Sequence, residues 1–317
     1  MPQRLIVYED RHWRSLRPLT DLLPVPALAF GASDLARRWL AAARRPLFGI
    51  EARAAAMAGW HAPPVPDTSV IGVGDEAVVL NAAALPGPWF EAAVESRAPS
   101  LWLGDGRIAG ARLPLALLRG AIGRGEDFEM VLLGLGLAAL PVDAEFIQFP
   151  WDLVARNTAA IVNDLAGVTG AVRGSVHPLA CLDHPERIVV ADGAVVGPYA
   201  VLDAAAGPIL VGRGARVEAH SHVRGPCVLG AGTQILGGVV GGSTFGPECR
   251  IAGEVEGSVW QGYGNKRHHG FVGHSVLGEW VNLGALTTTS DLKNNYSSVA
   301  VCLDGHTPVD TGSTKVG

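Results

Sequence analysis

The sequence feature that most constrains the fold is a six-residue repeat of aliphatic positions in the second half of the chain. Its longest strict run is Val211, Val217, Val223, Leu229 and Ile235, and glycine follows several of the repeat positions. A fixed short period is the signature of a solenoid. Three hexads complete one triangular coil, and each coil buries its aliphatic side chains on the next. The pattern also includes Val190, Val196, Leu202, Val239, Phe245, Ile251, Leu277 and Leu283.

The repeat predicts a left-handed parallel β-helix over residues 188–317. Residues 1–150 lack the repeat and contain short strand-like segments at 5–8, 77–81 and 101–109, which predict an α/β domain. Residues 151–187 are predicted to connect the two, and the helical spacing of apolar residues over 151–165 predicts an amphipathic helix that closes the first domain. Thr314–Gly317 is similar to the opening of another hexad. We therefore expect further coils after it.

Cationic and titratable side chains are densest in one glycine-rich stretch, residues 261–285, which contains Lys266, Arg267, His268, His269 and His274. Histidine titrates near neutral pH, so an imidazole beside fixed cations is a candidate proton acceptor for a nucleophile that carries an anionic group. A solvated basic loop is the alternative. The hexads break between Ile251 and Leu277, around this cluster, and again between Ala285 and Val299, which predicts two interruptions of the β-helix. Departures from a repeat are where such proteins place function.

The composition of the chain limits the classes of partner that it is expected to bind. Charged residues make up only 17% of the chain and the net charge of −5 is spread over both halves, so no basic face for nucleic acid is expected. The longest apolar run, residues 130–142, is too short to span a bilayer, and the first residues lack a signal peptide. We expect a cytoplasmic protein with small-molecule ligands. Four widely spaced cysteines predict reduced core thiols and no metal site: Cys181, Cys227, Cys249 and Cys302.

A charged turn follows the first predicted strand and carries Arg14, Arg17 and Asp21. In α/β folds, ligands bind where such a strand opens into a loop. If a nucleotide binds here, Arg17 is predicted to neutralise phosphate charge, and Asp21 to hold Mg²⁺ or cap the following turn. A solvated charged loop is again the alternative.

Three motifs carry a family resemblance: Asn265-Lys-Arg-His268, Gly278-Glu-Trp-Val-Asn-Leu-Gly-Ala285 and Asn294-Asn-Tyr296. They resemble the acetyltransferase half of the bacterial bifunctional UDP-N-acetylglucosamine pyrophosphorylase/glucosamine-1-phosphate N-acetyltransferase, and more closely its divergent sugar nucleotidyltransferase-like relatives. The resemblance covers most of the chain. It implies a nucleotidyltransferase-like first domain, acetyl-CoA-dependent acetylation of glucosamine 1-phosphate, uridylyl transfer from UTP as a second activity, and a homotrimer with active sites between neighbours.

The resemblance also implies roles for individual residues. His268 falls on the family's catalytic base, ten residues before Gly278. A backbone N–H near Gly284 and Ala285 is expected to contact acetyl-CoA and to stabilise the charge that develops on the thioester oxygen. Residues expected to bind the sugar phosphate are Asn265, Lys266, Arg267, Asn282, Asn295 and Tyr296. On an extended backbone His268 and His269 would point to opposite faces, with Lys266 on the side of His268.

The chain departs from the family at several positions. Glu256 and Phe271 stand where the family usually has a lysine and a tyrosine, so substrate contacts are shifted or different. The first domain lacks the glycine-rich G-x-G-T-R-M loop that holds nucleotide phosphates in ordinary sugar nucleotidyltransferases.

Two other functions remain open. His269 and His274, with His220 or His222 as a third ligand, have a spacing that fits a metal enzyme of the γ-carbonic-anhydrase kind. The missing glycine loop favours a noncatalytic scaffold that senses nucleotides.

Overall fold

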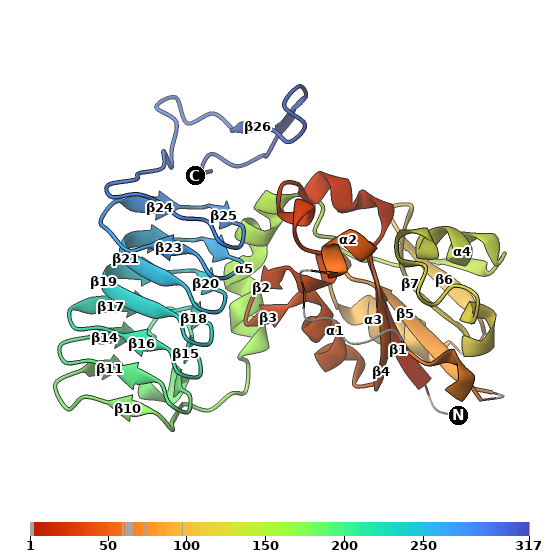
Figure 1. The fold of residues 1–317 in the computed structure, drawn as a ribbon, viewed down its shortest axis with the longest axis horizontal. Coiled ribbons are helices and arrows are strands. Elements are labelled where there is room, and N and C mark those ends of the chain that lie inside the picture. Colours follow the sequence, from red (N-terminus) through yellow and green to blue (C-terminus); the bar gives the residue numbers. More distant parts are fainter. Residues whose placement is uncertain (1–2, 59, 61–65, 73, 97, 317) are drawn as a thin grey trace. The chain divides into compact units, whose positions relative to one another are not determined.

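The structure is a computed structural model that describes residues 3–58, 60, 66–72, 74–96 and 98–316. The chain forms two compact units (Figure 1). Unit 1 comprises Met1–Leu28 and Ser33–Phe149, and unit 2 comprises Ala29–Ala32 and Pro150–Gly317. Unit 1 is the predicted α/β domain and unit 2 contains the predicted left-handed parallel β-helix, so both parts of the predicted fold class are confirmed.

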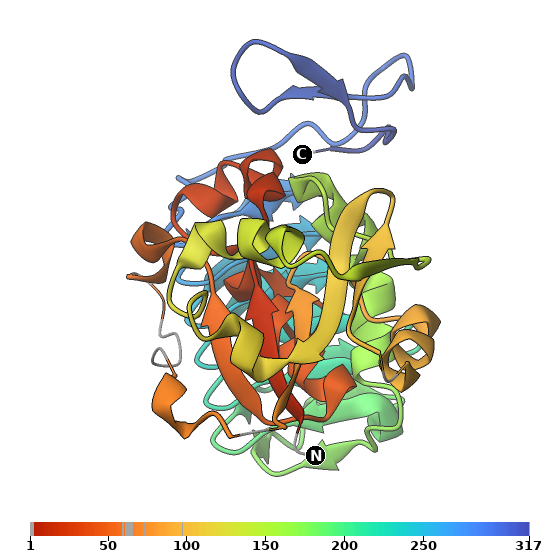
Figure 2. The same cartoon turned by 90° about the vertical axis from the view of Figure 1, so that its right-hand side faces the viewer.

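Unit 1 is built on a six-stranded sheet with the order β4-β1-β5-β7-β6-β8. Strands β4, β1 and β5 are parallel neighbours and lie side by side in Figure 2. Strand β7 is antiparallel to both β5 and β6, and β6 is parallel to β8. The strands are β1 (Gln3–Tyr8), β4 (Leu47–Glu51), β5 (Glu76–Asn81), β6 (Ser100–Gly104), β7 (Arg107–Pro114) and β8 (Ala138–Pro141), with the short β3 (Ser33–Asp34) outside the sheet.

The helices of unit 1 are short and pack aromatic side chains against the sheet. Trp39, Trp89, Phe90 and Trp102 meet edge to face, which is a favoured geometry for aromatic rings. The α-helices are α1 (Leu35–Ala43), α2 (Ala54–Met57), α3 (Pro88–Glu95) and α4 (Phe128–Gly134). The 3₁₀ helices are η1 (Arg11–Leu16), η2 (Leu19–Asp21), η3 (Val25–Ala27), η4 (Thr68–Val70), η5 (Leu115–Leu118) and η6 (Gly125–Asp127).

Unit 2 stacks short parallel strands into coils, which can be followed from β10 up to β25 in Figure 1. One face contains β9 (Ala171–Val172), β12 (Ile188–Val190), β15 (Ile209–Val211), β18 (Cys227–Leu229), β20 (Thr244–Phe245), β22 (Val259–Trp260) and β25 (Val276–Leu277). The other strands of the coils are β10 (Ser175–Val176), β11 (Cys181–Asp183), β13 (Val195–Val196), β14 (Val201–Asp203), β16 (Arg216–Val217), β17 (Ser221–Arg224), β19 (Gln234–Gly241), β21 (Arg250–Glu256), β23 (Asn265–Lys266) and β24 (Phe271–Gly273), with η7 (Pro185–Arg187) between β11 and β12.

Coil length varies, and this explains where the hexads were misread. On one face the pairing steps from Val190 to Val211, Leu229, Phe245, Trp260 and Leu277, so successive coils have 21, 18, 16, 15 and 17 residues. The stack is therefore continuous over residues 251–277, and the predicted interruption there was wrong. Coils with fewer than 18 residues have shorter turns at the corners, while the strands keep their pairing.

Two further details differ from the prediction. Val240 and not Val239 is the inward residue of β19, because two glycines with positive φ, Gly237 and Gly238, shift the register at the corner. The first coil begins at β9 and not at residue 188. It is the end of the stack and has a neighbour on one side only, so its residues are more exposed and less strictly aliphatic. Cys181 is exposed there for the same reason, and Cys302 is also exposed, so only Cys227 and Cys249 are core thiols.

Helix α5 (Pro150–Asp164) forms as predicted but packs in unit 2, against β18, β22 and β25, and does not close unit 1. Its buried Asn157 accepts hydrogen bonds from the Gly31 N–H at 2.9 Å and from the Thr244 hydroxyl at 3.0 Å. Gln261 accepts from the Ala29 N–H at 2.6 Å. These bonds fix β2 (Ala29–Phe30) to the β-helix. None of the helices in the described residues combines the length and apolar character needed to cross a membrane.

After the last coils, the chain forms an antiparallel hairpin of β26 (Ala300–Cys302) and β27 (Pro308–Asp310), which stands off the coil stack in Figure 1. The prediction of β-helix up to residue 317 was therefore wrong for this segment. Its polar and glycine-containing sequence has no inward aliphatic repeat.

One corner of the β-helix is held by a ladder of buried serines, Ser243, Ser258 and Ser275. Each hydroxyl donates to the carbonyl two residues earlier, at 2.7 to 2.8 Å. Each of the first two hydroxyls also accepts the N–H of the serine in the next coil, at 3.0 and 3.2 Å. The ladder satisfies buried backbone groups that the turn would otherwise leave unpaired.

We expect Ser258→Ala to lower the free energy of unfolding by about 1–3 kcal/mol, because it leaves the buried Ser275 N–H without its acceptor. Urea denaturation followed by circular dichroism measures this change. Ser290→Ala, at an exposed position, is the control and should change the value by less than about 0.5 kcal/mol. Equal effects of the two substitutions would contradict a stabilising ladder.

Candidate functional site

Buried polar side chains gather at one edge of the sheet in unit 1. Glu9 and Asp10 follow β1, Glu51 ends β4 and Asn81 ends β5, and all four are buried. Because these three strands are parallel neighbours, their carboxyl ends lie at the same edge. The chain leaves β1 toward β4 on one side and later returns to β5 on the other. Such a switch point is where α/β sheets bind ligands.

Asp10 is the centre of this cluster. Its Oδ2 lies 2.7 Å from Arg107 Nη2 and 2.8 Å from Asn81 Nδ2, and its Oδ1 accepts the His12 N–H at 3.1 Å. Burial raises the pKa of Asp10, but the hydrogen bond from His12, the charge and hydrogen bond of Arg107 and the hydrogen bond from Asn81 together lower it to about 2. The carboxylate is therefore ionised at neutral pH and neutralised by Arg107.

Glu9 fixes the loop that follows β1. Its carboxylate accepts the Val25 N–H at 2.7 Å and Arg53 Nε at 2.7 Å. The Arg53 guanidinium also donates to the Thr20 carbonyl at 2.7 Å and lies 3.7 Å from the centre of the Trp13 ring. One buried ion pair thus holds three separate turns of the loop.

The predicted nucleotide residues lie on this loop, on its exposed side. Arg14 is exposed and stacks on Trp13, with 4.6 Å between the guanidinium carbon and the ring centre. Arg17 and Asp21 pair with each other, at 2.7 Å between Arg17 Nε and Asp21 Oδ1. Asp21 is thus the ion-pair partner of Arg17 in this structure, and its expected role toward Mg²⁺ stays a prediction. The pair is exposed, so its net contribution to the stability of the fold is small. Arg17 can therefore leave Asp21 and pair with a phosphate instead.

Sequence reasoning missed these members of the cluster: the buried Glu9, Asp10 and Asn81, and the partly buried Arg53 and Arg107. The signal for the first two was present, because an acidic pair directly follows a buried strand. Arg53 and Arg107 gave no such signal, since they come from separate parts of the chain and meet only in the fold.

In unit 2, residues 267–270 form a bend between β23 and β24, which we call the histidine bend. Its Arg267, His268 and His269 side chains are all exposed. The backbone here is a bend and not an extended strand. The prediction that alternation would separate His268 from His269 was therefore wrong.

Lys266 lies inside the β-helix. It is 0% exposed, and its Nζ donates to the carbonyls of Ala252, His268 and Gly270 at 2.6, 3.1 and 2.9 Å. All three ammonium N–H groups are used, so this side chain does not reach a sugar phosphate or share the outer face of His268. The predicted substrate role of Lys266 was wrong, because its position in the strand points inward.

Two of the predicted sugar-binding residues meet in adjacent coils. Asn265 Nδ2 donates to Asn282 Oδ1 at 2.6 Å, and the two residues form a parallel bridge. Gly284 and Ala285, two and three residues after Asn282, are exposed. The side-chain amides of Asn265 and Asn282 therefore meet on the outer surface of adjacent coils. Asn265 is two residues before the histidine bend.

Asn295 and Tyr296 lie apart from this group, on the segment between β25 and β26. Asn295 Oδ1 accepts from the N–H and hydroxyl of Ser297, and the Tyr296 side chain is 70% exposed. Among the hydrogen bonds in the described part of unit 2, none joins either side chain to the histidine bend.

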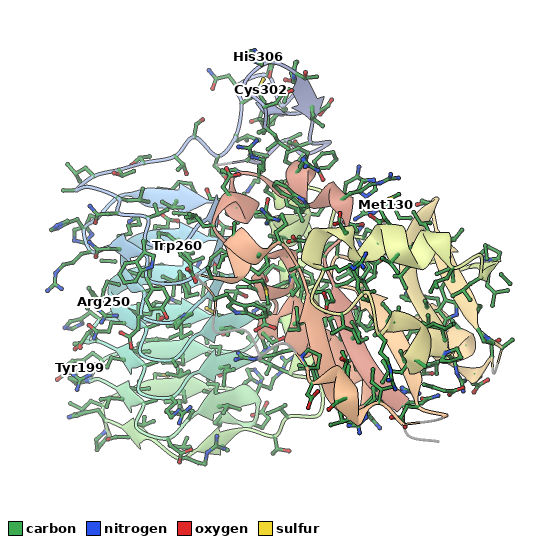
Figure 3. The ribbon with its side chains drawn as sticks, turned by 45° about the vertical axis from the view of Figure 1, so that its right-hand side comes forward. Met130, Tyr199, Arg250, Trp260, Cys302 and His306 are labelled. Atoms are coloured by element: carbon green, nitrogen blue, oxygen red, sulfur yellow. The ribbon has the colours of Figure 1, made fainter. Side chains whose placement is uncertain are left out.

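The histidines of the metal alternative have other neighbours. His274 Nδ1 lies 2.5 Å from Asp291 Oδ1, and His220 stacks on Tyr199, which lies at the outer edge of the coils in Figure 3. His222 Nε2 lies 3.9 Å from Asp203. Within the described ranges, no three His, Cys, Asp or Glu side chains converge where a metal ion could bind.

We call Glu9, Asp10, Glu51, Arg53, Asn81 and Arg107 the strand-edge cluster. The stability of unit 1 should depend on pH through its Asp10. Its pKa is about 2 in the folded chain against an ordinary 3.8, so the ionised carboxylate contributes about 2 kcal/mol above pH 3.8, which is lost as pH falls toward 2. We expect Asp10→Asn to be destabilising at pH 6, with a gap to the wild type that narrows between pH 4 and pH 2.

Urea unfolding at a series of pH values measures this gap. Asp21→Asn, which removes an exposed carboxylate, is the control and should cost less than about 1 kcal/mol. A gap for Asp10→Asn that stays constant down to pH 2 would contradict the assigned role.

Comparison with known proteins identifies the N-terminal part of the chain. A search of curated proteins with the whole chain found no match. The family described as sugar nucleotidyl transferase matches residues 5–172, which is more than half of the 317 residues and includes the strand-edge cluster and helix α5. The chain therefore belongs to the sugar nucleotidyl transferase family.

Proposed function

We propose that unit 2 transfers the acetyl group of acetyl-CoA to the amine of glucosamine 1-phosphate, with His268 as the general base. The observation that carries the proposal is the exposed histidine bend beside the Asn265–Asn282 pair. The motif resemblance to the bifunctional N-acetyltransferase supports the same reaction. The β-helix is a fold typical of acyltransferases.

The acetyl transfer needs a general base, a cation for the sugar phosphate and N–H donors for the oxyanion. The histidine bend and the residues near Ala285 contain these groups. His268 removes a proton from the sugar ammonium, and the freed amine attacks the thioester carbonyl. The new C–N bond forms, the C–S bond breaks, and CoA leaves as a thiolate that takes up a proton. Arg267 is exposed next to His268 and is the cation that we assign to the sugar phosphate, now that Lys266 is buried. Backbone N–H groups near Ala285 would stabilise the oxyanion.

The rest of the site would come from a homotrimer. Asn295 and Tyr296, which lie apart from the bend in one chain, would reach it from a neighbouring chain. This arrangement follows from the family resemblance and makes trimerisation a requirement for turnover.

A second function, binding of UTP for uridylyl transfer, is favoured by the strand edge of unit 1. Exposed Arg14 and Arg17 lie on the loop after β1, at the edge where nucleotide-binding sheets hold phosphates. Mg²⁺ commonly binds through phosphates and only one or two carboxylates, so it would arrive on the triphosphate. A scaffold that only senses nucleotides would bind UTP in the same place without turnover.

We expect His268→Ala to reduce acetyl-CoA turnover by about 10²–10⁴-fold, because the general base is lost. Release of free CoA, measured with a panel of amino-sugar phosphates, is the readout. His269→Ala, the adjacent exposed histidine, is the matched control and should retain far more activity. Exchange of the two phenotypes would move the base by one residue, and unchanged turnover in both would reject the acetyltransferase proposal.

We expect UTP with Mg²⁺ to release or absorb heat on binding to the wild type in calorimetry, and Arg17→Ala to weaken this binding by about tenfold through loss of one charge-assisted phosphate contact. Arg37→Ala is the control, because Arg37 also pairs with a nearby aspartate on the surface of unit 1, at 3.4 Å. No heat with the wild type would exclude the nucleotide site.

A further inference from the structure

Lys266 interrupts a column of aliphatic side chains. The register of the coils aligns Val176, Val196, Val217, Ile235, Ile251 and Lys266 at one inward position. The members from Val196 to Ile251 are at most 1% exposed, and Lys266 is as buried as they are. A lysine at such a position loses hydration and must regain its hydrogen bonds inside the protein.

The partners of the ammonium are backbone carbonyls and not carboxylates. Two of the three, those of His268 and Gly270, belong to the histidine bend, and the third is the Ala252 carbonyl in the coil before it. No ion pair to Lys266 is found among the described residues, and burial lowers the pKa of its ammonium. The charge is thus held by three carbonyl dipoles, which must turn inward to reach it.

Two glycines make this arrangement sterically possible. Gly253 has φ of +79°, and a Cβ there would lie 2.9 Å from Lys266 Nζ. Gly270 has φ of +132°, and a Cβ there would lie 2.1 Å from the Thr287 carbonyl oxygen. Both positions allow close backbone approach that an L-residue would block.

The bonds to Lys266 determine which way the bend faces. With the His268 and Gly270 carbonyls turned into the β-helix, the side chains between Lys266 and Gly270 are left outside. The backbone of the bend is then tied to the neighbouring coils on both sides. The Glu254 N–H donates to the Gly270 carbonyl at 3.1 Å, and the Leu286 N–H donates to the His269 carbonyl at 2.9 Å.

We propose that Lys266 is a positioning residue: its buried ammonium holds the carbonyls of the histidine bend and thereby presents His268 to the substrate. The consequence for catalysis rests on the proposed acetyltransferase function. The consequence for the bend itself does not, because it concerns backbone order alone.

The first test uses Lys266→Met, which keeps an unbranched side chain but removes the ammonium. Ile251→Met, at the same inward position one coil earlier, is the matched control for repacking. Hydrogen–deuterium exchange of the Glu254 and Leu286 amides reports the order of the bend. We expect exchange at both amides to be about tenfold faster in Lys266→Met, and unchanged in Ile251→Met, because the bend opens locally.

The second test measures acetyl-CoA turnover. We expect Lys266→Met to lower kcat by about 10–100-fold, as loss of an orienting partner does, with little change in the KM for acetyl-CoA. In a His268→Ala background the same substitution should add a much smaller loss than in the wild type, because most of the effect of Lys266 on turnover passes through His268. Lys266→Gln, which retains two N–H donors, should fall between the wild type and Lys266→Met, and it serves if the methionine variant does not fold.

The outcomes separate the two claims. Unchanged amide exchange in folded Lys266→Met would overturn the positioning role. A loss of turnover in the His268→Ala background as large as that in the wild type would also overturn it, since Lys266 would then not act through His268. Faster exchange in a protein whose wild type lacks turnover would uphold the control of the bend and reject the acetyltransferase function.

Discussion

Stacking of inward side chains from coil to coil is the interaction on which unit 2 depends. Each inward position of a β-helix repeats once per coil, so a residue there contacts its equivalents above and below as well as the inward residues of the other faces. The column tolerates aliphatic residues of different size, and it excludes a charge unless the backbone itself supplies the partners. Lys266 meets this condition, and two of the three carbonyls that it binds belong to the histidine bend, which carries two exposed histidines. A structural requirement of the interior and the presentation of an outer surface are therefore the same feature.

Unit 1 handles buried charge differently. Glu9 and Asp10 are each paired with an arginine from a distant part of the chain, and both carboxylates also accept backbone N–H groups. Removing one partner of such a pair leaves an uncompensated charge, which is far more destabilising than the pair is stabilising. The cluster thus fixes the loop after β1 rigidly, while the arginines on the outer side of that loop stay exposed to ligands.

The hexad pattern was sufficient to predict the β-helix, because one aliphatic position per six residues is a direct consequence of a triangular coil. It failed in register at β19, where Val240 and not Val239 points inward, because the backbone at the corner glycines Gly237 and Gly238 shifts the register without a signature in the aliphatic spacing. For the site, residue type and motif indicated the exposed Arg267 and His268. They could not show that Lys266, in the same motif, points inward, because that depends on strand register. The Asp10–Arg107 and Glu9–Arg53 pairs could not be predicted from the sequence for a different reason. Their members are far apart in the chain and meet only in the tertiary structure.

The variable length of the coils has a consequence for how such a chain can change over generations. Between Val190 and Leu277 the coil takes anything from 15 to 21 residues while the strands keep their pairing. A codon gained or lost at a corner therefore leaves the neighbouring coils in register, whereas the same event inside a strand would reverse the facing of the residues beyond it. The surface of unit 2 can thus be remodelled by short insertions and deletions, independently of the interior that holds it together.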